Sequence, residues 1–333
     1  MRVILSIETS CDDTCAAVVE PLGAGARALS NVVHTQTEHE RYGGVVPEVA
    51  SRAHLERMDG VIQDALERAG ASLSDVQKVA VTTNPGLIGA LLVGVSAAKG
   101  LAYSRRLPLV AVDHLEGHVA AAYLTDPELE PPFVASIASG GHTALYAVEE
   151  DRRIHRLGAT LDDAAGEALD KGARMLGLGF PGGPALSKAG AEGDPAAYDF
   201  PVALKGRDDL RFSFSGLKTS LLYRLKEIDE DEMSEALPDL AASYESAVVE
   251  ALTRKLVRAA ELQDVRSLVV AGGVAANSRL RERLREECGA RGLELVIPPP
   301  ELCTDNAAMI GAAALYTPEI RYPDYLSVNA RSV

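Results

Sequence analysis

Residues 3–19 have the sequence VILSIETSCDDTCAAVV. Two apolar runs flank a small polar turn, and this pattern predicts the two strands of a β-hairpin. Residues 133–149, FVASIASGGHTALYAVE, align with the first segment without a gap at an offset of 130. The repeat predicts two domains of similar architecture, each beginning with a hairpin whose polar tip faces a shared cleft. Chance similarity between two unrelated hairpins is the alternative.

A chain of 333 residues is long enough for two domains of ordinary size. Apolar runs at 78–82, 109–112, 267–271 and 293–297 predict strands, and they alternate with helical patterns at 48–68, 87–103 and 231–262 and from residue 278 onward. This alternation predicts an α/β fold. We expect one domain over residues 1–131, a second over 132–304, and a helix at about 305–325 that packs back on the first.

The composition is that of an ordinary globular protein, with 47% hydrophobic and 24% charged residues. The formal net charge of −15 opposes non-specific binding to nucleic acid, so such binding would require a local basic patch or a partner. The four cysteines form no C-x-x-C pair, and no signal-peptide pattern precedes the first strand. The most apolar stretch, residues 86–98, is too short to cross a membrane. We therefore expect a cytoplasmic protein.

Two histidines, His114 and His118, stand four residues apart at the end of an expected strand and the start of a helical run. On a helix this spacing places both imidazoles on one face, which is a common half-site for a transition metal. The alternative is that both histidines merely pack or face solvent. Asp305, at the expected start of the last helix, is the best candidate for a third ligand.

Glu116 lies between the histidines and suggests the zinc-protease motif H-E-x-x-H, but the spacing differs. Two residues beyond His114, its side chain points about 200° away on a helix. A capping role is simpler, with Asp113 as the N-cap and Glu116 at the third helical position.

Three further stretches suggest ligand contacts. Gly272 to Asn277 is a glycine-containing turn between the expected strand at 267–271 and the expected helix from residue 278. A strand–glycine turn–helix pattern of this kind holds phosphate groups in many α/β proteins. Phe180 to Pro184 is a glycine- and proline-rich turn whose bare backbone could approach a ligand closely. Residues 205–226 are locally basic, with Arg207 among the cations, Asp208 among the few acids, and Phe212 and Phe214 between them. This last stretch is either an amphipathic surface helix or a nucleic-acid-binding edge.

Two hairpin-led domains around a nucleotide cleft resemble the actin, sugar-kinase and Hsp70 superfamily. Motifs along almost the whole chain further resemble, in order, the TsaD family in its bacterial form. These motifs are Glu8-Thr9-Ser10-Cys11-Asp12, Gly43-Gly44-Val45-Val46-Pro47-Glu48, His114-Leu115-Glu116-Gly117-His118, Ser139-Gly140-Gly141-His142-Thr143, Asp162-Asp163-Ala164-Ala165-Gly166-Glu167, Phe214-Ser215-Gly216-Leu217-Lys218-Thr219, Ala271-Gly272-Gly273-Val274 with Asn277, and Cys303-Thr304-Asp305-Asn306.

Members of this family are tRNA N6-adenosine threonylcarbamoyltransferases, formerly described as O-sialoglycoprotein endopeptidases. The resemblance implies transfer of a threonylcarbamoyl group from threonylcarbamoyl-AMP to N6 of the adenosine 3′ of the anticodon, in tRNAs that read codons starting with A. AMP is released. It also implies three protein partners: an inactive paralogue that forms a heterodimer, a small ATPase subunit, and a separate enzyme that makes the adenylate.

The resemblance also assigns site residues. It implies that His114, His118 and Asp305 hold one divalent metal ion, Fe²⁺ with Zn²⁺ as the alternative. Asp12, on the first hairpin tip, would face the same site and orient the amine or accept its proton. The positions that match adenylate contacts are Ile137, Ala138, Ser139, Gly140, Gly141, Asp170, Gly183 and Asn277.

Three other functions compete with this interpretation. An ATP-dependent small-molecule kinase of the same superfold would share the hairpins and glycine turns but would have no use for the histidine pair. A metalloprotease would need a general base beside the metal, which Glu116 does not supply on helical geometry. A non-catalytic scaffold would be expected to lose the ligand set, and all three candidate ligands are present.

Overall fold

The computed structural model describes residues 2–42, 44–179, 181–205, 209–229 and 231–331. Five residues of the stretches discussed above, Gly43, Phe180, Gly206, Arg207 and Asp208, lie outside this described part. The chain divides into two compact units, Met1–Glu130 with Thr304–Val333, and Pro131–Cys303. Each unit is described separately below.

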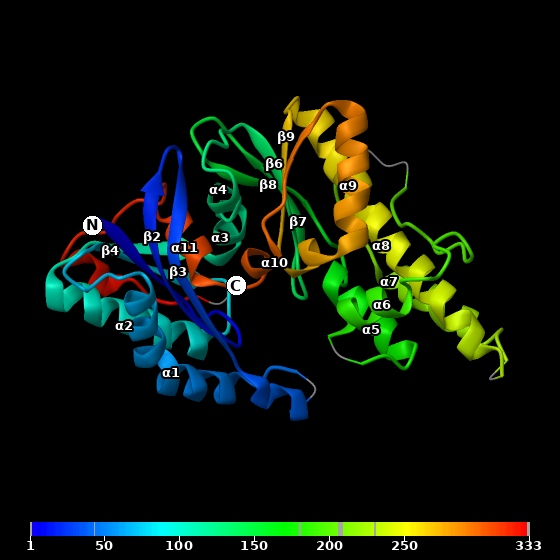
Figure 1. The fold of residues 1–333 in the computed structure, drawn as a ribbon, viewed down its shortest axis with the longest axis horizontal. Helices are drawn as coiled ribbons and strands as arrows, with labels where there is room; N and C mark the ends of the chain where they lie inside the picture. The colour runs from blue at the N-terminus through cyan, green and yellow to red at the C-terminus, as the bar shows by residue number, and fades with distance from the viewer. Residues whose placement is uncertain (1, 43, 180, 206–208, 230, 332–333) are drawn as a thin grey trace. The chain divides into compact units, whose positions relative to one another are not determined.

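The first unit contains a five-stranded sheet in the order β3-β2-β1-β4-β5 (Figure 1). The apolar residues of the first repeat form β1 (Val3–Glu8) and β2 (Asp13–Leu22), which pair antiparallel with Ile4 opposite Val19. Strand β3 (Gly25–Thr35) continues the meander, whereas β4 (Val76–Asn84) and β5 (Leu109–Asp113) run parallel to β1. The carboxyl ends of β1, β4 and β5 therefore meet at one edge of the sheet.

Side-chain alternation along β1 separates the two faces of this sheet. Val3, Leu5 and Ile7 belong to a core that includes Met58 and Val95, on helices α1 (Pro47–Arg68) and α2 (Ile88–Arg105). These two helices lie side by side in Figure 1. On the other face, the Ser6 hydroxyl donates a 2.6 Å hydrogen bond to the carbonyl of Ala307, the first residue of α11 (Ala307–Ala313). Glu8 has the same parity as Ser6 and so belongs to this second face.

The short elements on the second face include α3 (His114–Ala120), which packs against α11, and α4 (Ala122–Thr125). Two 3₁₀ turns, η1 (Thr37–Tyr42) and η3 (Asp324–Ser327), complete the unit. Helix α11 is shorter than the expected helix at 305–325 and begins after the N-cap Asn306, whose side chain accepts a hydrogen bond from Met309 N at 3.0 Å. Pro318 lies a few residues beyond its end, and proline disfavours helical backbone in the residue before it.

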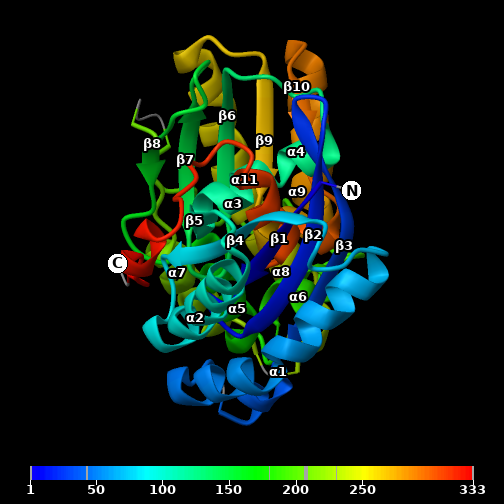
Figure 2. The ribbon, with the colours of Figure 1, turned by 90° about the vertical axis from the view of Figure 1, so that its left-hand side faces the viewer.

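The second unit contains a sheet in the order β10-β9-β6-β7-β8, as Figure 2 shows. Its strands are β6 (Phe133–Ala138), β7 (Thr143–Val148), β8 (Ile154–Ala159), β9 (Ser267–Ala271) and β10 (Glu294–Val296). The pairing β6–β7 is antiparallel and β6–β9 parallel, as in the first unit. The two units thus share one strand pattern, which confirms the prediction of two similar α/β halves.

The helices of the second unit surround one apolar core. The longest, α8 (Met233–Gln263), begins and ends close to the predicted bounds and is buried along most of its length. Helix α5 begins at Ala165, after the acidic pair Asp162-Asp163, and α7 covers the second half of the stretch at 205–226. The other bounds are α5 (Ala165–Met175), α6 (Gly182–Ala189), α7 (Ser215–Leu225), η2 (Gly273–Ala276), α9 (Ser278–Arg291) and α10 (Pro300–Cys303). Among the described residues, none of the helices has the length and apolar character that a membrane crossing requires.

Gly311 allows α11 to sit directly on β1 and β2. A Cβ there would lie 2.5 Å from Val19 Cγ2 and 2.9 Å from Ser6 Oγ. Gly311→Ala should therefore lower the free energy of unfolding by about 1–3 kcal/mol, as overpacked cores do. Denaturant unfolding measures this change, and hydrogen exchange should locate it in the first unit.

Gly289→Ala is the matched control, because Gly289 is also helical but a Cβ there meets nothing within 4 Å. Replacing a glycine in an open helical position should stabilise by up to about 1 kcal/mol. Equal effects of both substitutions would contradict the packing explanation.

Candidate metal centre and anion site

The two predicted histidines lie on α3, directly after β5. The Asp113 carboxylate caps this helix and accepts hydrogen bonds from Leu115 N at 2.8 Å and Glu116 N at 3.3 Å. A third hydrogen bond to this carboxylate, from Asn84 Nδ2 at 2.5 Å, connects the start of α3 to the end of β4. The predicted N-cap is thus confirmed, and it fixes where α3 begins. His114 and His118 are both buried, with ring centroids 4.7 Å apart and planes at 80°.

Asp305 reaches the histidine pair because α11 packs tightly against α3. Gly117 lies at this contact, where an added Cβ would come within 2.7 Å of Ile310 Cδ1 and 3.4 Å of Met309 Cγ. Gly117 therefore serves close helix packing. The backbone of Asp305 is also held from the sheet, since the Cys15 thiol contacts its carbonyl oxygen at 3.8 Å.

The predicted ligand set comes together in the first unit. Asp305 Oδ1 lies 3.4 Å from His114 Nε2 and 3.2 Å from His118 Nε2. Within the described residues, these three side chains are the group able to hold a metal ion, with all ligand atoms within 4.8 Å of one another. Ligands about 2.1 Å from one tetrahedral metal lie about 3.4 Å apart, so the separations fit a shared ion. Two imidazoles and a carboxylate suit iron or zinc.

Glu8 is a second carboxylate at this centre, and the sequence analysis did not single it out as a site residue. Its Oε2 lies 3.0 Å from His114 Nδ1 and accepts a 2.5 Å hydrogen bond from the Thr82 hydroxyl, while Oε1 accepts from Ser10 N. A carboxylate on the far nitrogen of a ligating imidazole fixes the ring and makes its other nitrogen a better ligand. The sequence did offer a signal for this role, because Glu8 ends a predicted buried strand and lies on the same face of that strand as Ser6.

The charges of this cluster are strongly linked. Burial disfavours the charged form of His114, but the Asp305 and Glu8 carboxylates outweigh it and hold the pKa of His114 well above its usual range. Burial likewise opposes ionisation of Asp305 and Glu8, and the imidazoles nevertheless hold the pKa of Asp305 well below its usual range and lower that of Glu8. Two carboxylates beside one imidazolium leave excess negative charge, which favours a divalent cation.

Glu116 is not part of the metal-ligating group, although it lies between the two histidines. Its carboxylate is half-buried, and burial together with Asp113 raises its pKa. The general base that a metalloprotease requires is therefore not supplied by this residue.

Most of the predicted adenylate contacts gather in the second unit. Ser139, Gly140 and Gly141 form the turn at the carboxyl end of β6, and a Cβ on either glycine would meet nothing within 4 Å. The side chains of Ile137 and Ala138 are fully buried, so these two residues could offer a ligand only their backbone. The amino end of α5 abuts the turn, where Gly166 N donates a 3.0 Å hydrogen bond to Ser139 O.

Asp170 and Gly183 lie on neighbouring helices of the same region. The Asp170 carboxylate accepts a 2.7 Å hydrogen bond from Gly182 N and so holds the start of α6 beside α5. A Cβ at Gly183 would meet only Leu169 Cδ1, at 3.8 Å, so packing does not require glycine there. The N-cap residues of α5 and α6 make no side-chain cap of their own, but the first N–H groups of both helices are bonded elsewhere, Ala165 N to Thr143 Oγ1 at 2.7 Å and Gly182 N to Asp170. The positive dipole ends of the two helices favour an anion.

Asn277 has its side chain engaged within the protein. Its amide oxygen accepts a 2.9 Å hydrogen bond from Leu280 N as the N-cap of α9. Its amide nitrogen donates to Glu245 Oε1 at 2.6 Å and to Ser187 Oγ, on α6, at 3.2 Å. Asn277 therefore links the glycine turn after β9 to α6, next to the region that contains Gly183.

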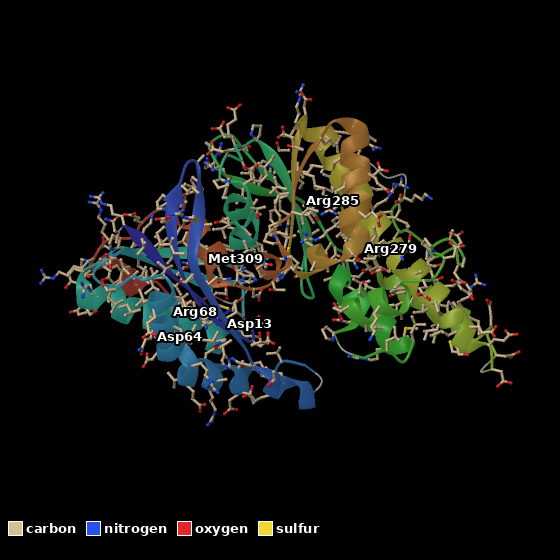
Figure 3. All side chains as sticks on the ribbon, viewed as in Figure 1. Asp13, Asp64, Arg68, Arg279, Arg285 and Met309 are labelled. Carbon is tan, nitrogen blue, oxygen red and sulfur yellow. The ribbon has the colours of Figure 1, made fainter. Side chains whose placement is uncertain are left out.

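Asp12 lies in the loop between β1 and β2 in the first unit. Its side chain is half-buried, and its carbonyl accepts a 3.2 Å hydrogen bond from Gln36 N. The next residue, Asp13, is labelled in Figure 3; burial, reinforced by the nearby Asp305 and Asp12 charges, raises its pKa to about 6. Neither carboxylate belongs to the metal-ligating group.

In the described part of the stretch at 205–226, the aromatic side chains do not lie on the surface. Phe212 and Phe214 are buried in the core of the second unit and are not available to stack on bases. The Asp162 carboxylate is bound to the start of α7, where it accepts hydrogen bonds from Phe214 N at 2.7 Å and Ser213 Oγ at 2.5 Å. Burial raises the pKa of Asp162, but these hydrogen-bond donors outweigh it and lower the pKa below its usual value.

Comparison with known proteins identifies the class of fold. The activator of the 2-hydroxyisocaproyl-CoA dehydratase from Clostridium difficile has a TM-score of 0.51 at 15% identity, over 94% of each chain. Full-length HypF has a TM-score of 0.60 at 14% identity, over 95% of this chain and 46% of the HypF chain. These similarities establish the predicted two-domain, actin-like α/β fold.

The family follows from sequence. The model of the family TsaD, tRNA N6-adenosine threonylcarbamoyltransferase, matches residues 27–312. A relative of that name from Syntrophus aciditrophicus is 49% identical over 99% of this chain and 96% of its own length. Another, from Anaeromyxobacter dehalogenans, is 52% identical over 95% and 94%. The chain belongs to the TsaD family of transferases.

Metal binding at this centre should depend on His114 and His118. The variant His114→Ala/His118→Ala should lose the single metal ion of the wild-type protein, since only Asp305 would remain of the three ligands. Glu8→Gln should keep the ion but weaken its affinity by about 10–100-fold, as changes behind a ligating histidine do. Metal analysis after anaerobic purification and chelator titration measures both effects.

Glu116→Gln is the control on the same helix and should leave metal content and affinity unchanged. Full metal content in the double histidine variant would refute the assignment of the centre.

Proposed function

We propose that this protein transfers the threonylcarbamoyl group of threonylcarbamoyl-AMP to N6 of the adenosine 3′ of the anticodon, in tRNAs that read codons starting with A. The main support is that His114, His118 and Asp305 lie together as a possible metal site, in a chain that matches the transferase family over nearly its full length. A small-molecule kinase of the same superfold has no need for this ligand set, which makes the kinase alternative less well supported.

His114, His118 and Asp305 would hold one divalent ion, which we take to be Fe²⁺ with Zn²⁺ as the alternative. When bound, such an ion acts as a Lewis acid that polarises and orients the oxygens of the threonylcarbamoyl group. Glu8 would hold the His114 ring in place through Nδ1, 3.0 Å from Oε2. The burial of both histidines keeps bulk water from their ring nitrogens.

The adenylate would bind through the second unit. The turn at Gly140 and Gly141 would offer backbone N–H groups, and the amino ends of α5 and α6 would add their positive dipole ends. Asp170 would keep α6 in position through its hydrogen bond to Gly182 N, while Asn277 ties the glycine turn to α6 through Ser187. Donors fixed in this way would stabilise the charge that develops on the departing AMP.

In the transfer, N6 of the adenosine attacks the carbonyl carbon of the threonylcarbamoyl group. A carbon–nitrogen bond forms, the bond between that carbon and the phosphate oxygen breaks, and AMP leaves with the electron pair. The attacking amine loses one proton. We assign to Asp12 the role of orienting the amine or accepting this proton. Much of the acceleration would come from holding the two substrates together.

We further propose that the protein acts in the cytoplasm with an inactive paralogue, as a heterodimer, and with a small ATPase subunit. The support is the family membership and the net charge of −15, which makes recruitment of tRNA by this chain alone unfavourable outside a local basic site. A separate enzyme would supply the adenylate.

The function is tested by mass spectrometry of tRNA nucleosides from cells depleted of the protein. Threonylcarbamoyladenosine should fall below a few per cent of its normal level, because no other route forms it in a cell with one copy of this enzyme. Wild-type protein should restore it, and His114→Ala/His118→Ala should not.

His155→Ala serves as the control because His155 is an exposed histidine of the second unit, 47% accessible at its side chain. This variant should restore the modified nucleoside in full. Normal levels of the nucleoside after verified depletion would overturn the transferase assignment and favour the kinase.

A further inference from the structure

A groove of about 420 Å³ on the second unit has no role in the function proposed above. It lies between α8 and α9 and is closed at one side by residues 202–205. The residues discussed as adenylate contacts are not among those that line it. The groove is therefore a separate feature of the unit.

The lining of this groove is strongly basic for so acidic a chain. Six cationic side chains face three carboxylates, in a protein whose formal net charge is −15. The cations are Lys205, Arg254, Lys255, Arg258, Arg283 and Arg291, and the carboxylates are Glu250, Glu261 and Glu287. An excess of positive charge in a concave surface attracts anions from a distance.

The glutamates pair with the arginines and hold them in position. Arg258 pairs with Glu261 at 2.9 Å, and Arg283 also lies 3.6 Å from Glu286, which is not among the lining residues. Glu250 lies 4.0 Å from Arg254 on α8 and 3.6 Å from Arg283 on α9, so one carboxylate serves two guanidinium groups. Glu287 is shared in the same way by Arg283, at 2.7 Å, and Arg291. Guanidinium groups held in this manner lose less conformational freedom when they bind a phosphate.

The base of the groove adds a fixed positive charge. The Lys255 ammonium is mostly buried and donates hydrogen bonds to the carbonyl oxygens of Asp209, at 2.7 Å, and Leu204, at 3.4 Å. These bonds hold the segment that carries the exposed Lys205 against α8. The four arginines, by contrast, are each about 40% exposed at the side chain and can reach a ligand.

We propose that this groove binds the phosphodiester backbone of the substrate tRNA. The proposal rests on the transferase function, which requires this acidic chain to bind a polyanion. The arginines lie on two helices, and Arg283 and Arg291 are about two turns apart along α9. Cations spread in this way suit several phosphates of one strand better than a single free phosphate. The contacts would supply affinity and orientation without reading sequence.

The test measures binding of an unmodified tRNA transcript to the full-length protein by fluorescence anisotropy at several salt concentrations. The variant Arg254→Gln/Arg291→Gln removes one cation from each helix. It should weaken binding at least tenfold at about 0.1 M salt and lower the salt-dependence slope by roughly 1.5, since each lost phosphate contact contributes about 0.7–0.9.

Arg285→Gln is the matched control, because Arg285 is exposed on the same helix but does not line the groove (Figure 3). It should bind tRNA as the wild type does. Melting temperature and metal content, equal in all variants, would exclude a folding defect. Arg254→Lys/Arg291→Lys keeps the charge and should retain most of the binding.

Unchanged binding in the double glutamine variant, or an equal loss in the Arg285→Gln control, would overturn the proposal. Displacement of tRNA by inorganic phosphate beyond the effect of chloride at equal ionic strength would overturn it too, because the groove would then be a site for free phosphate. Failure of the transferase function is separable: wild type would form no modified nucleoside, while groove-dependent tRNA binding would persist.

Discussion

The contact between the Asp305 carboxylate and the His114 and His118 imidazoles joins the last part of the chain to its middle, and the centre depends on it. The contact exists because α11 lies against both α3 and the sheet. Gly117 and Gly311 permit these close approaches, and Ser6 anchors the first carbonyl of α11. The glycines, the cap at Asp113 and the register of β1 thus all serve one arrangement of three side chains.

The same cluster gathers more charge than a protein interior usually holds. The Glu8 carboxylate is buried and that of Asp305 is partly buried, and His114 favours the ionised form of both. Buried charges are strongly destabilising when a partner is lost, so such a cluster is maintained where it serves a purpose. A bound divalent ion would bring two positive charges to this cluster and would suit both the charge excess and the ligand geometry. At the predicted adenylate contacts of the second unit, by contrast, helix dipole ends and backbone N–H groups would favour an anion.

Much of this architecture could be predicted from the sequence, because strong patterns acted locally. The two hairpins, the parallel strands and the Asp113 cap followed from periodicity and capping chemistry. Strands β3 and β8 were missed, since their residues are largely half-buried or exposed and carry no continuous apolar run. Glu8 was missed because its role depends on which face of β1 meets α11, and Asp162 because its partners lie about 50 residues away. The basic groove likewise arises only when α8 and α9 pack together.

The central claim is that His114, His118 and Asp305 bind one metal ion. Anomalous diffraction from crystals of the protein purified without chelators, collected above and below the iron and zinc absorption edges, tests it most directly. The account predicts one anomalous peak about 2.0–2.2 Å from His114 Nε2, His118 Nε2 and an Asp305 carboxylate oxygen. A peak at other residues would contradict it. The absence of a peak at these three residues, in crystals of metal-loaded protein in which the three side chains are well ordered, would contradict it too.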